Sequence, residues 1–268
     1  MIDAARYLRR IGMDAHVGPT SLELLAALQV AHLIHVPFEN LHVYHRRGPR
    51  TDADWSVHKI VEERRGGWCF EVNGAFATLL RALGFQAHHV SCQVWESAGQ
   101  WGVPFDHLAS MVELDGERWF VDVGFGDNCV EPLLVAQVER PSVPRPVRTE
   151  VTDEAGVDHF VLTELMPADD RAADAETRWE PQLRVRLEPT TLDRFTPRSQ
   201  HLQTFPGLSW QEKPFATRAL DAEGSRATLR SSVLRTRHGT GPYIDTPVDP
   251  ASWSELLLEH FDLVDTLR

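Results

Sequence analysis

In the first 84 residues, apolar side chains recur at the three- and four-residue spacing of helices that bury one face. Three segments show this pattern: 20–35 (TSLELLAALQVAHLIH), 56–64 (SVHKIVEER) and about 69–83. In the first segment Thr20 and Glu23 form a predicted capping box, and Pro37 marks the end of the helix. Gly84 is expected to close the third helix, because glycine tolerates the left-handed conformation that follows many helices. The chain is therefore predicted to begin as a helical unit.

After Gly84 the apolar positions alternate, as they do in strands with one buried face. Three strands are predicted in a row: 85–95, 107–114 and 117–123. Beyond them the pattern predicts a loop, an exposed acidic segment, short strands and a last helix: 140–148, 167–178, 226–237 and 251–267. Helices that come first and strands that come later are typical of an α+β fold with separate units.

The dipeptide Asp115-Gly116 predicts a two-residue hairpin turn between the second and third strands. One face of this hairpin is mainly apolar and should pack on a core, with these residues opposite each other: Leu114 and Glu117, Val112 and Trp119, Ser110 and Val121, Leu108 and Val123. The other face carries His107 and Asp122 as diagonal neighbours. Such pairs lie roughly 7–8 Å apart in sheets, which an Asp–imidazole hydrogen bond can bridge. A register slip by one residue would move both side chains to the opposite face together.

The composition, with 42% hydrophobic and 25% charged residues, is typical of a soluble globular protein. The net charge of −12 argues against nucleic acid as the main partner. No apolar run is long enough to cross a bilayer, and the N-terminus lacks the pattern of a secretion signal. Three cysteines without a CxxC pair fit a reducing compartment, so a cytoplasmic protein is expected.

The charge is uneven along the chain. Residues 181–240 hold ten Lys/Arg against five Asp/Glu, although the whole chain is acidic. This balance indicates either an ordinary mixed surface or a site for a phosphorylated ligand.

Cys69 is the cysteine whose position favours chemistry. It opens a predicted helix, where unpaired N–H groups and the helix dipole stabilise a thiolate. Gly66 and Gly67 let the backbone turn sharply before it and leave room beside the sulfur. The alternative is a loop that leads into a helix, with Cys69 as a small core residue. Cys92, in mid-strand, and Cys129, after a glycine turn, are interpreted as structural.

A nucleophilic cysteine needs a histidine within hydrogen-bond reach and a third group that holds the ring. His107 and Asp122 meet this need on one face of the hairpin. With Cys69 they favour a catalytic triad over the alternative of a merely structural His–Asp pair. No metal is expected, because the remaining candidate ligands lack the spacing of a known zinc motif: His88, His89, Cys92 and Cys129.

These residues lie in motifs that resemble those of the arylamine N-acetyltransferases. Three segments carry the match: RGGWC (65–69) with the Glu71 and Asn73 that follow, PFENL (37–41), and DHLASMVELDGERWFVDVGFG (106–126). The resemblance is strong over about 5–135 and weaker beyond.

The resemblance implies a helical bundle, a central β-barrel and a C-terminal α/β lid around a papain-like cysteine-protease core. These units would span 1–84, 85–195 and 196–268. It also implies a ping-pong reaction, in which acetyl-coenzyme A acetylates the cysteine as co-substrate. An arylamine, arylhydrazine or N-hydroxyarylamine then takes the acetyl group. Small molecules would be the partners, with no membrane and no nucleic acid.

The same resemblance gives roles to individual residues. Cys69 would be the acetyl acceptor, His107 the acid/base and Asp122 the group that orients it. A glycine turn would lie near the cleft for the acyl donor and acceptor: Gly124, Phe125 and Gly126. A structural ion pair is also implied: Glu39 with Arg64.

The proposed chemistry adds further expectations. Backbone N–H groups near Cys69 or Gly124 could hold the oxyanion. Aromatic acceptors should stack near Phe125 and near Trp68 or Trp95. The phosphates of coenzyme A would meet basic residues of the 181–240 segment: Arg194, Arg198 or Lys213.

In its third unit the family has a short Ser/Pro-rich segment that ends in an aromatic residue and helps to bind the donor. The corresponding stretch here, TFPGLSWQEKPF (204–215), matches loosely, so the acyl donor stays open. Related enzymes use other acyl groups, and some close amides within polyketide products. A Cys–His–Asp hydrolase or transglutaminase-like enzyme is another alternative, whereas the intact triad disfavours an idle binding protein. The oligomeric state also stays open, a homodimer included.

Overall fold

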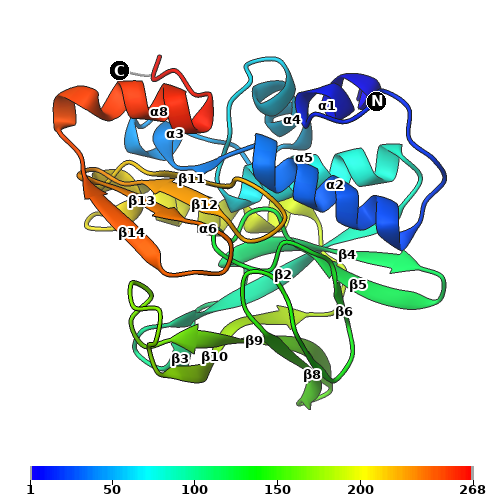
Figure 1. Ribbon diagram of the computed structural model, residues 1–268. Helices are drawn as coiled ribbons and strands as arrows, with labels where there is room; N and C mark the ends of the chain where they lie inside the picture. The colour runs from blue at the N-terminus through cyan, green and yellow to red at the C-terminus, as the bar shows by residue number, and fades with distance from the viewer. Residues whose placement is uncertain (1, 267–268) are drawn as a thin grey trace.

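The computed structural model describes residues 2–266, and its first third is helical (Figure 1). The helices are α1 (Ala4–Arg10), α2 (Leu22–His35), α3 (Leu41–Tyr44), α4 (Ala53–Val61) and α5 (Cys69–Ala82). The three predicted helices are therefore confirmed; the third starts at Cys69 as predicted, the first starts two residues later, and the second lies three residues earlier. Ser21, not Thr20, caps α2, because its Oγ accepts the N–H of Leu24 at 3.1 Å. The φ of +95° at Gly84 ends the turn after α5 in the left-handed region, as expected.

Nine strands form a curled sheet that lies against the helices (Figure 1). They are β2 (Gln86–Glu96), β3 (Gln100–Trp101), β4 (His107–Leu114), β5 (Glu117–Val121), β6 (Leu133–Leu134), β7 (Val138–Arg140), β8 (Val147–Glu154), β9 (Val157–Pro167) and β10 (Thr177–Arg186). Their order is β6-β5-β4-β2-β10-β9-β8-β7, with β3 paired to β2. The sheet encloses an apolar core of its own that includes Val90, Phe120, Phe160 and Leu183.

The predicted register of the β4–β5 hairpin is confirmed. Leu114 pairs with Glu117, and the ladder continues to Ser110 with Val121. Asp115 and Gly116 have φ angles of +52° and +83°, as a tight hairpin turn with two left-handed residues requires. The two faces separate as expected, since Val112 and Val121 join the helical core while Met111 and Phe120 join the core of the sheet.

A second sheet of five strands covers the other side of the helices (Figure 1). It consists of β1 (Phe38–Glu39), β11 (Ala216–Ala219), β12 (Arg226–Leu229), β13 (Val233–Arg237) and β14 (Tyr243–Pro247), in that order. Because β1 comes from the N-terminal third and pairs with β11, this sheet is joined to the helical part by backbone hydrogen bonds. We call this sheet, with the helices around it, the lid.

The helices that follow β10 are η1 (Leu192–Phe195), α6 (Thr196–Thr204), α7 (Ser209–Glu212), η2 (Pro250–Ser252) and α8 (Trp253–Phe261). Trp253, Leu257 and Phe261 pack α8 on β11 and β12. This helix is shorter than the predicted 251–267, because Asp262 adopts a left-handed conformation that ends it. Residue 267 lies outside the described residues. The predicted α+β class is confirmed, with two sheets and the helices as separate layers.

Between residues 2 and 266, the structure contains no helix of the length and apolar character that crossing a membrane requires.

Candidate active site

The segment before α5 is held so tightly against β1 that only glycine fits. The Gly67 carbonyl accepts the N–H of Glu39 at 2.9 Å, and the Gly67 N–H donates to Pro37 at 3.2 Å. A Cβ on Gly66 would overlap the carbonyl oxygen of Pro37, and a Cβ on Gly67 would lie 2.8 Å from the Glu71 side chain. These contacts place Cys69 as the first residue of α5, where backbone N–H groups have no helical partner.

The start of α5 is fixed by a buried ion pair. Both carboxylate oxygens of Glu71 accept hydrogen bonds from Lys59 Nζ, at 2.8 and 2.9 Å. Both side chains are almost completely buried. Glu71 also reaches back to the N–H of Trp68 at 3.3 Å, which satisfies one of the open donors of the helix. The position of Cys69 therefore depends on α4 as well as on its own helix.

His107 opens β4 and lies between Asp122 and Cys69. Its Nε2 is 2.6 Å from Asp122 Oδ2, and the Cys69 side chain is close enough to raise the pKa of its ring. Because Nε2 is taken by the carboxylate, Nδ1 is the nitrogen left for the thiol. All three side chains are buried, with exposures between 3% and 6%.

Asn73, one turn into α5, joins the helix to both strands of the hairpin. Its Nδ2 donates to Asp122 Oδ1 at 2.9 Å and to the carbonyl of Leu108 at 2.6 Å. Its Oδ1 accepts the N–H of Val123 at 2.9 Å. Asn73 thus holds Oδ1 of Asp122, while Oδ2 bonds His107.

The electrostatics of this site favour a charged histidine. Burial alone would lower the pKa of His107, but the Asp122 carboxylate and the hydrogen bonds to Asp122 and Cys69 outweigh it and raise that pKa. An imidazolium at neutral pH can stabilise a thiolate beside it. The arrangement can therefore supply a nucleophilic sulfur and, after the sulfur is acylated, a general base.

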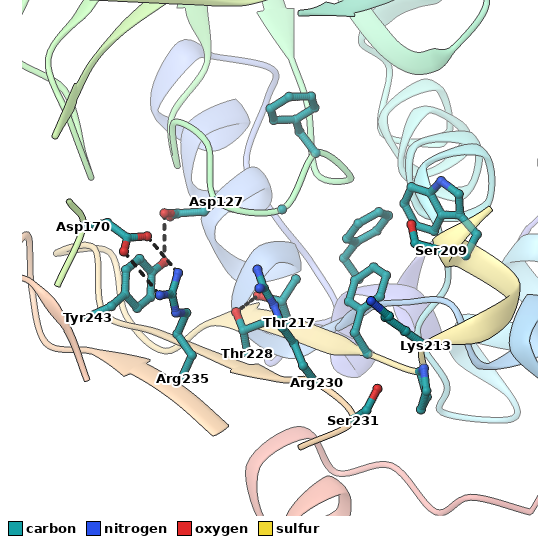
Figure 2. Close-up of a pocket in the computed structure, with 16 residues that line it drawn as sticks. Asp127, Asp170, Ser209, Lys213, Thr217, Thr228, Arg230, Ser231, Arg235 and Tyr243 are labelled. Carbon is teal, nitrogen blue, oxygen red and sulfur yellow. Dashed lines mark hydrogen bonds and ion pairs between the residues drawn. The ribbon is translucent and has the colours of Figure 1, made fainter. Parts of the chain in front are cut away.

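A cavity of about 540 Å³ lies between the turn that follows Asp122 and the lid (Figure 2). Phe125 and Gly126 form part of its wall, and the Phe125 ring contacts the ring of His107 edge-on, with centroids 5.3 Å apart. Apolar rings and cations line the rest of it, including Phe38, Trp210, Phe215, Lys213, Arg230 and Arg235. The cavity thus joins an aromatic surface near His107 to a basic surface on the lid.

The family model described as N-acetyltransferase matches residues 21–266 of this sequence. The chain belongs to the arylamine N-acetyltransferase family. It is 27% identical to arylamine N-acetyltransferase 2 of Rattus norvegicus over 254 residues, which cover 91% of this chain and 87% of the relative. It is 34% identical to proansamycin X synthase of Amycolatopsis mediterranei over 141 residues, which cover 51% and 54% of the two chains.

Solved structures of arylamine N-acetyltransferases have the same fold. The enzyme of Mycobacterium marinum in complex with CoA superposes with a TM-score of 0.82 at 23% identity, over 97% of this chain and 92% of that one. The helices, the curled sheet and the lid are thus the arylamine N-acetyltransferase fold, with its core like that of papain-like cysteine proteases. This confirms the fold that the sequence motifs implied.

The structure brings together the three residues predicted as catalytic, and it places the predicted turn in two parts. Phe125 and Gly126 line the cavity, whereas Gly124 lies against α5. The Gly124 N–H already donates to Asp122 Oδ1 at 2.8 Å. The Gly124 N–H is therefore not free to hold an oxyanion, and the first amides of α5, near Cys69, stay the predicted donors.

The predicted pair of Glu39 with Arg64 is also wrong. Arg64 is exposed and pairs with Asp262 at 3.0 Å, while the buried Glu39 carboxylate lies 3.7 Å from Lys59. Arg65 is the buried arginine next to Glu39 and lowers its pKa, together with Lys59. The cation within ion-pair distance of Glu39 is therefore Lys59, and not one of the two adjacent arginines.

Two other sets of predicted contacts need correction. Trp68 is buried, 1% exposed, and Trp95 packs on Trp101, so neither lines the cavity, whereas Trp210 does. Among the three predicted phosphate contacts only Lys213 lines it. Arg198 pairs with Asp106 at 2.7 Å, and Arg194 lies over the ring of Phe105.

Some functional candidates carry no local signal in the sequence. Trp210 and Lys213 belong to the loosely matching 204–215 stretch, and Arg230 follows an ordinary short strand. The basic balance of residues 181–240 was the one available hint. Among residues 2–266, the structure groups no three His, Cys, Asp or Glu side chains closely enough to share a metal ion.

Proposed function

We propose that the chain transfers an acetyl group from acetyl-coenzyme A to the nitrogen of an aromatic amine or hydrazine, through an acetyl-Cys69 intermediate. The observation that carries this proposal is the position of His107, which lies 2.6 Å from Asp122 and close to Cys69. Membership of the arylamine N-acetyltransferase family supports the same chemistry.

In the first half-reaction, Cys69 gives its proton to His107 Nδ1 and attacks the thioester carbonyl as a thiolate. The carbonyl oxygen becomes an oxyanion beside the first amides of α5. When the carbon–sulfur bond to coenzyme A breaks, the leaving thiolate takes the proton from His107. The products of this step are acetyl-Cys69 and free coenzyme A.

In the second half-reaction, the amine nitrogen attacks the acetyl carbonyl, and His107 accepts a proton from it. Acylation prepares the histidine for this role, because it removes the thiolate charge that helps to raise the pKa of His107. Burial, which lowers that pKa, remains. The breakdown of the intermediate releases the amide and returns the proton to the Cys69 sulfur.

Lys213 and Arg230 are proposed to hold the phosphates of the donor. Both line the cavity, and neither forms an ion pair with any residue in the described part of the chain. Replacing either with Ala should raise the Michaelis constant for acetyl-coenzyme A about tenfold, as expected for a lost charged hydrogen bond. Arg194→Ala is the matched control, since Arg194 lies outside the cavity. An unchanged Michaelis constant in both cavity variants would refute this assignment.

A second candidate function is amide synthesis with another acyl donor. The match to proansamycin X synthase favours it, although that match spans about half of each chain. A panel of acyl-coenzyme A thioesters offered with 4-methylaniline distinguishes the two. Acetyl-coenzyme A as the best substrate supports the first function, and a strong preference for larger acyl groups supports the second.

A different experiment distinguishes acyl transfer from hydrolysis by the same triad. If the chain transfers acyl groups, p-nitrophenyl acetate should acylate Cys69 and release p-nitrophenol, and an aniline should then speed turnover by removing the acetyl group. The acetanilide should accumulate in proportion to the p-nitrophenol. Equal turnover with and without the aniline, and acetate as the only product, would contradict acyl transfer.

We further propose a cytoplasmic location, which is supported by three cysteines that are all free and buried. A homodimer remains a prediction from the sequence, and size-exclusion chromatography with light scattering would test it.

A further inference from the structure

Tyr243, the first residue of β14, separates two cavities. The cavity beside Phe125 has a volume of about 540 Å³, and a second cavity of about 510 Å³ lies between the lid and the curled sheet. Three residues border both of them: Asp127, Asp170 and Tyr243. The aromatic ring is the largest of the three side chains, so Tyr243 forms most of the wall between the two cavities.

The Tyr243 ring is held from several sides. Its hydroxyl donates to Asp127 Oδ2 at 2.8 Å, and its backbone N–H donates to the carbonyl of Asp170 at 2.7 Å. The guanidinium groups of Arg235 and Arg237 each lie 4.8 Å from the ring centroid. Cation–π contacts and a charged hydrogen bond therefore fix the ring as a wall.

The position of Tyr243 relative to the reacting atoms suggests which substrate would meet it. In Figure 2, Tyr243 and Asp170 lie at one end of the first cavity, and Ser209 and Lys213 lie at the other. An aromatic amine that presents its nitrogen near His107 and keeps its apolar end away from the charge of Lys213 would extend that end toward Tyr243.

The second cavity suits an apolar group. Leu165, Met166 and Pro242 form an apolar part of its wall, beside polar residues, and three alanines of the 168–176 segment add small side chains. Its cations are already neutralised, since Arg145 and Arg237 both bond to Asp127. A hydrocarbon chain could therefore enter without displacing a charged partner.

We infer that Tyr243 is a specificity-determining residue that limits the length of the acceptor amine, by closing the passage to the second cavity. The inference rests on the proposed acetyl transfer to aromatic amines. The triad itself does not determine this limit on the length of the acceptor.

The test compares 4-methylaniline with 4-hexylaniline as acceptors, with p-nitrophenyl acetate as donor so that the coenzyme A surface is not involved. The measured quantity is the ratio of kcat/KM for the long amine to that for the short one. Tyr243→Ala should raise this ratio about tenfold, the effect expected when a pocket accepts several added methylenes. Tyr243→Phe is the matched control, because it keeps the ring and removes only the bond to Asp127, so its ratio should stay that of the unmodified protein.

A second change closes the passage again. Adding Ala172→Phe to the Tyr243→Ala variant fills the second cavity and should return the ratio toward its original value. If Tyr243→Ala does not fold, as judged by circular dichroism, Tyr243→Leu takes its place with the same expected direction.

A folded Ala or Leu variant with an unchanged ratio would overturn the inference, as would an equal rise in the Phe variant. If the unmodified protein acetylates neither amine, acetyl transfer to aromatic amines itself fails, and the inference fails with it.

Discussion

His107 is the residue on which both half-reactions depend, because each of its ring nitrogens has a different partner. Asp122 holds Nε2 and, by its charge, raises the pKa of the ring against the effect of burial. A raised pKa means that the imidazolium persists to higher pH than in a free histidine. The imidazolium should therefore be present at neutral pH and below, and it is lost as the pH rises through the pKa of His107.

The Asp122→Asn variant tests whether Asp122 raises the pKa of His107. Without the carboxylate, burial dominates and the pKa of His107 falls, so the imidazolium is no longer present at neutral pH. Alkylation of Cys69 by iodoacetamide should then need a higher pH in the variant than in the unmodified protein, because no imidazolium is left beside the sulfur. Acyl transfer should fall about 10³- to 10⁴-fold. An identical pH profile in the variant would show that Asp122 does not control the ring.

Gly124 packs closely against the first turns of α5, which leaves no room for a side chain at this position. A Cβ at this position would be 2.7 Å from both Asn73 Nδ2 and Val72 Cγ2. Gly124→Ala should push the turn away from α5 and shift Asp122, and a displacement of about 1 Å in a catalytic group can cost about 100-fold in rate. Gly18→Ala is the control, since nothing lies within 4 Å of its added methyl. Steady-state kinetics with p-nitrophenyl acetate and an aniline would measure both, and full activity of the Gly124 variant would contradict the close packing.

Among the helices, α2 shows how a start can be misassigned by one residue. Thr20 and Ser21 are adjacent, and either could cap a helix by its sequence, but only the Ser21 hydroxyl accepts the N–H of Leu24. Ser21→Ala should lower the free energy of unfolding by about 1 kcal/mol, the usual value of an N-cap. Thr20→Ala should change it far less. Urea unfolding midpoints would compare the two, and a larger loss from Thr20→Ala would restore the original assignment.

Much of the local structure around the site could be predicted from the sequence. The Asp115-Gly116 turn determined the hairpin register, and with it the juxtaposition of His107 and Asp122. The start of α5 at Cys69 could be predicted because glycine and helix signals are local. The pairing of β1 with β11 could not, since two residues from the N-terminal third carry no pattern that indicates a partner almost 180 positions later.

Across the whole molecule, Asp127 connects the catalytic turn to both neighbouring layers. Five hydrogen bonds and ion pairs reach its carboxylate from four residues: Arg145 before β8, Arg226 on β12, Arg237 on β13 and Tyr243 on β14. These cations hold the pKa of Asp127 well below its usual range. A second carboxylate, Glu164, pairs with Arg145, so three guanidinium groups share two acids. The turn that carries Phe125 is therefore fastened to the curled sheet and to the lid at one point.

Asp127→Asn should destabilise the fold, because it leaves the buried Arg226 and Arg237 without a carboxylate. We expect a loss of about 2–3 kcal/mol, somewhat below the usual cost of breaking a fully buried pair, since the Asp127 side chain is 27% exposed. Asp169→Asn is the control, because Asp169 is exposed and pairs only with Arg171 in the described part of the chain. Equal urea midpoints for the two variants would contradict a central role for the cluster.

The sequence did not indicate this cluster, for a physical reason. Its members are up to 116 positions apart, and their charges look like those of any solvated surface until the lid and the sheet are packed together. The contacts around Tyr243 and the cations that line the cavity were likewise not indicated by the sequence. Periodicity and turn chemistry describe neighbours along the chain, whereas these contacts are made by the assembled molecule.

The central claim is that Cys69 becomes acetylated by a thioester donor with the help of His107. The most direct measurement is the intact mass of the protein after brief incubation with acetyl-coenzyme A and no acceptor, followed by peptide mapping. The account predicts a gain of about 42 Da on the Cys69 peptide, as a covalent intermediate requires, which disappears on addition of an aniline and is absent in Cys69→Ala. No added mass on the unmodified protein, or the same mass on Cys69→Ala, would contradict it.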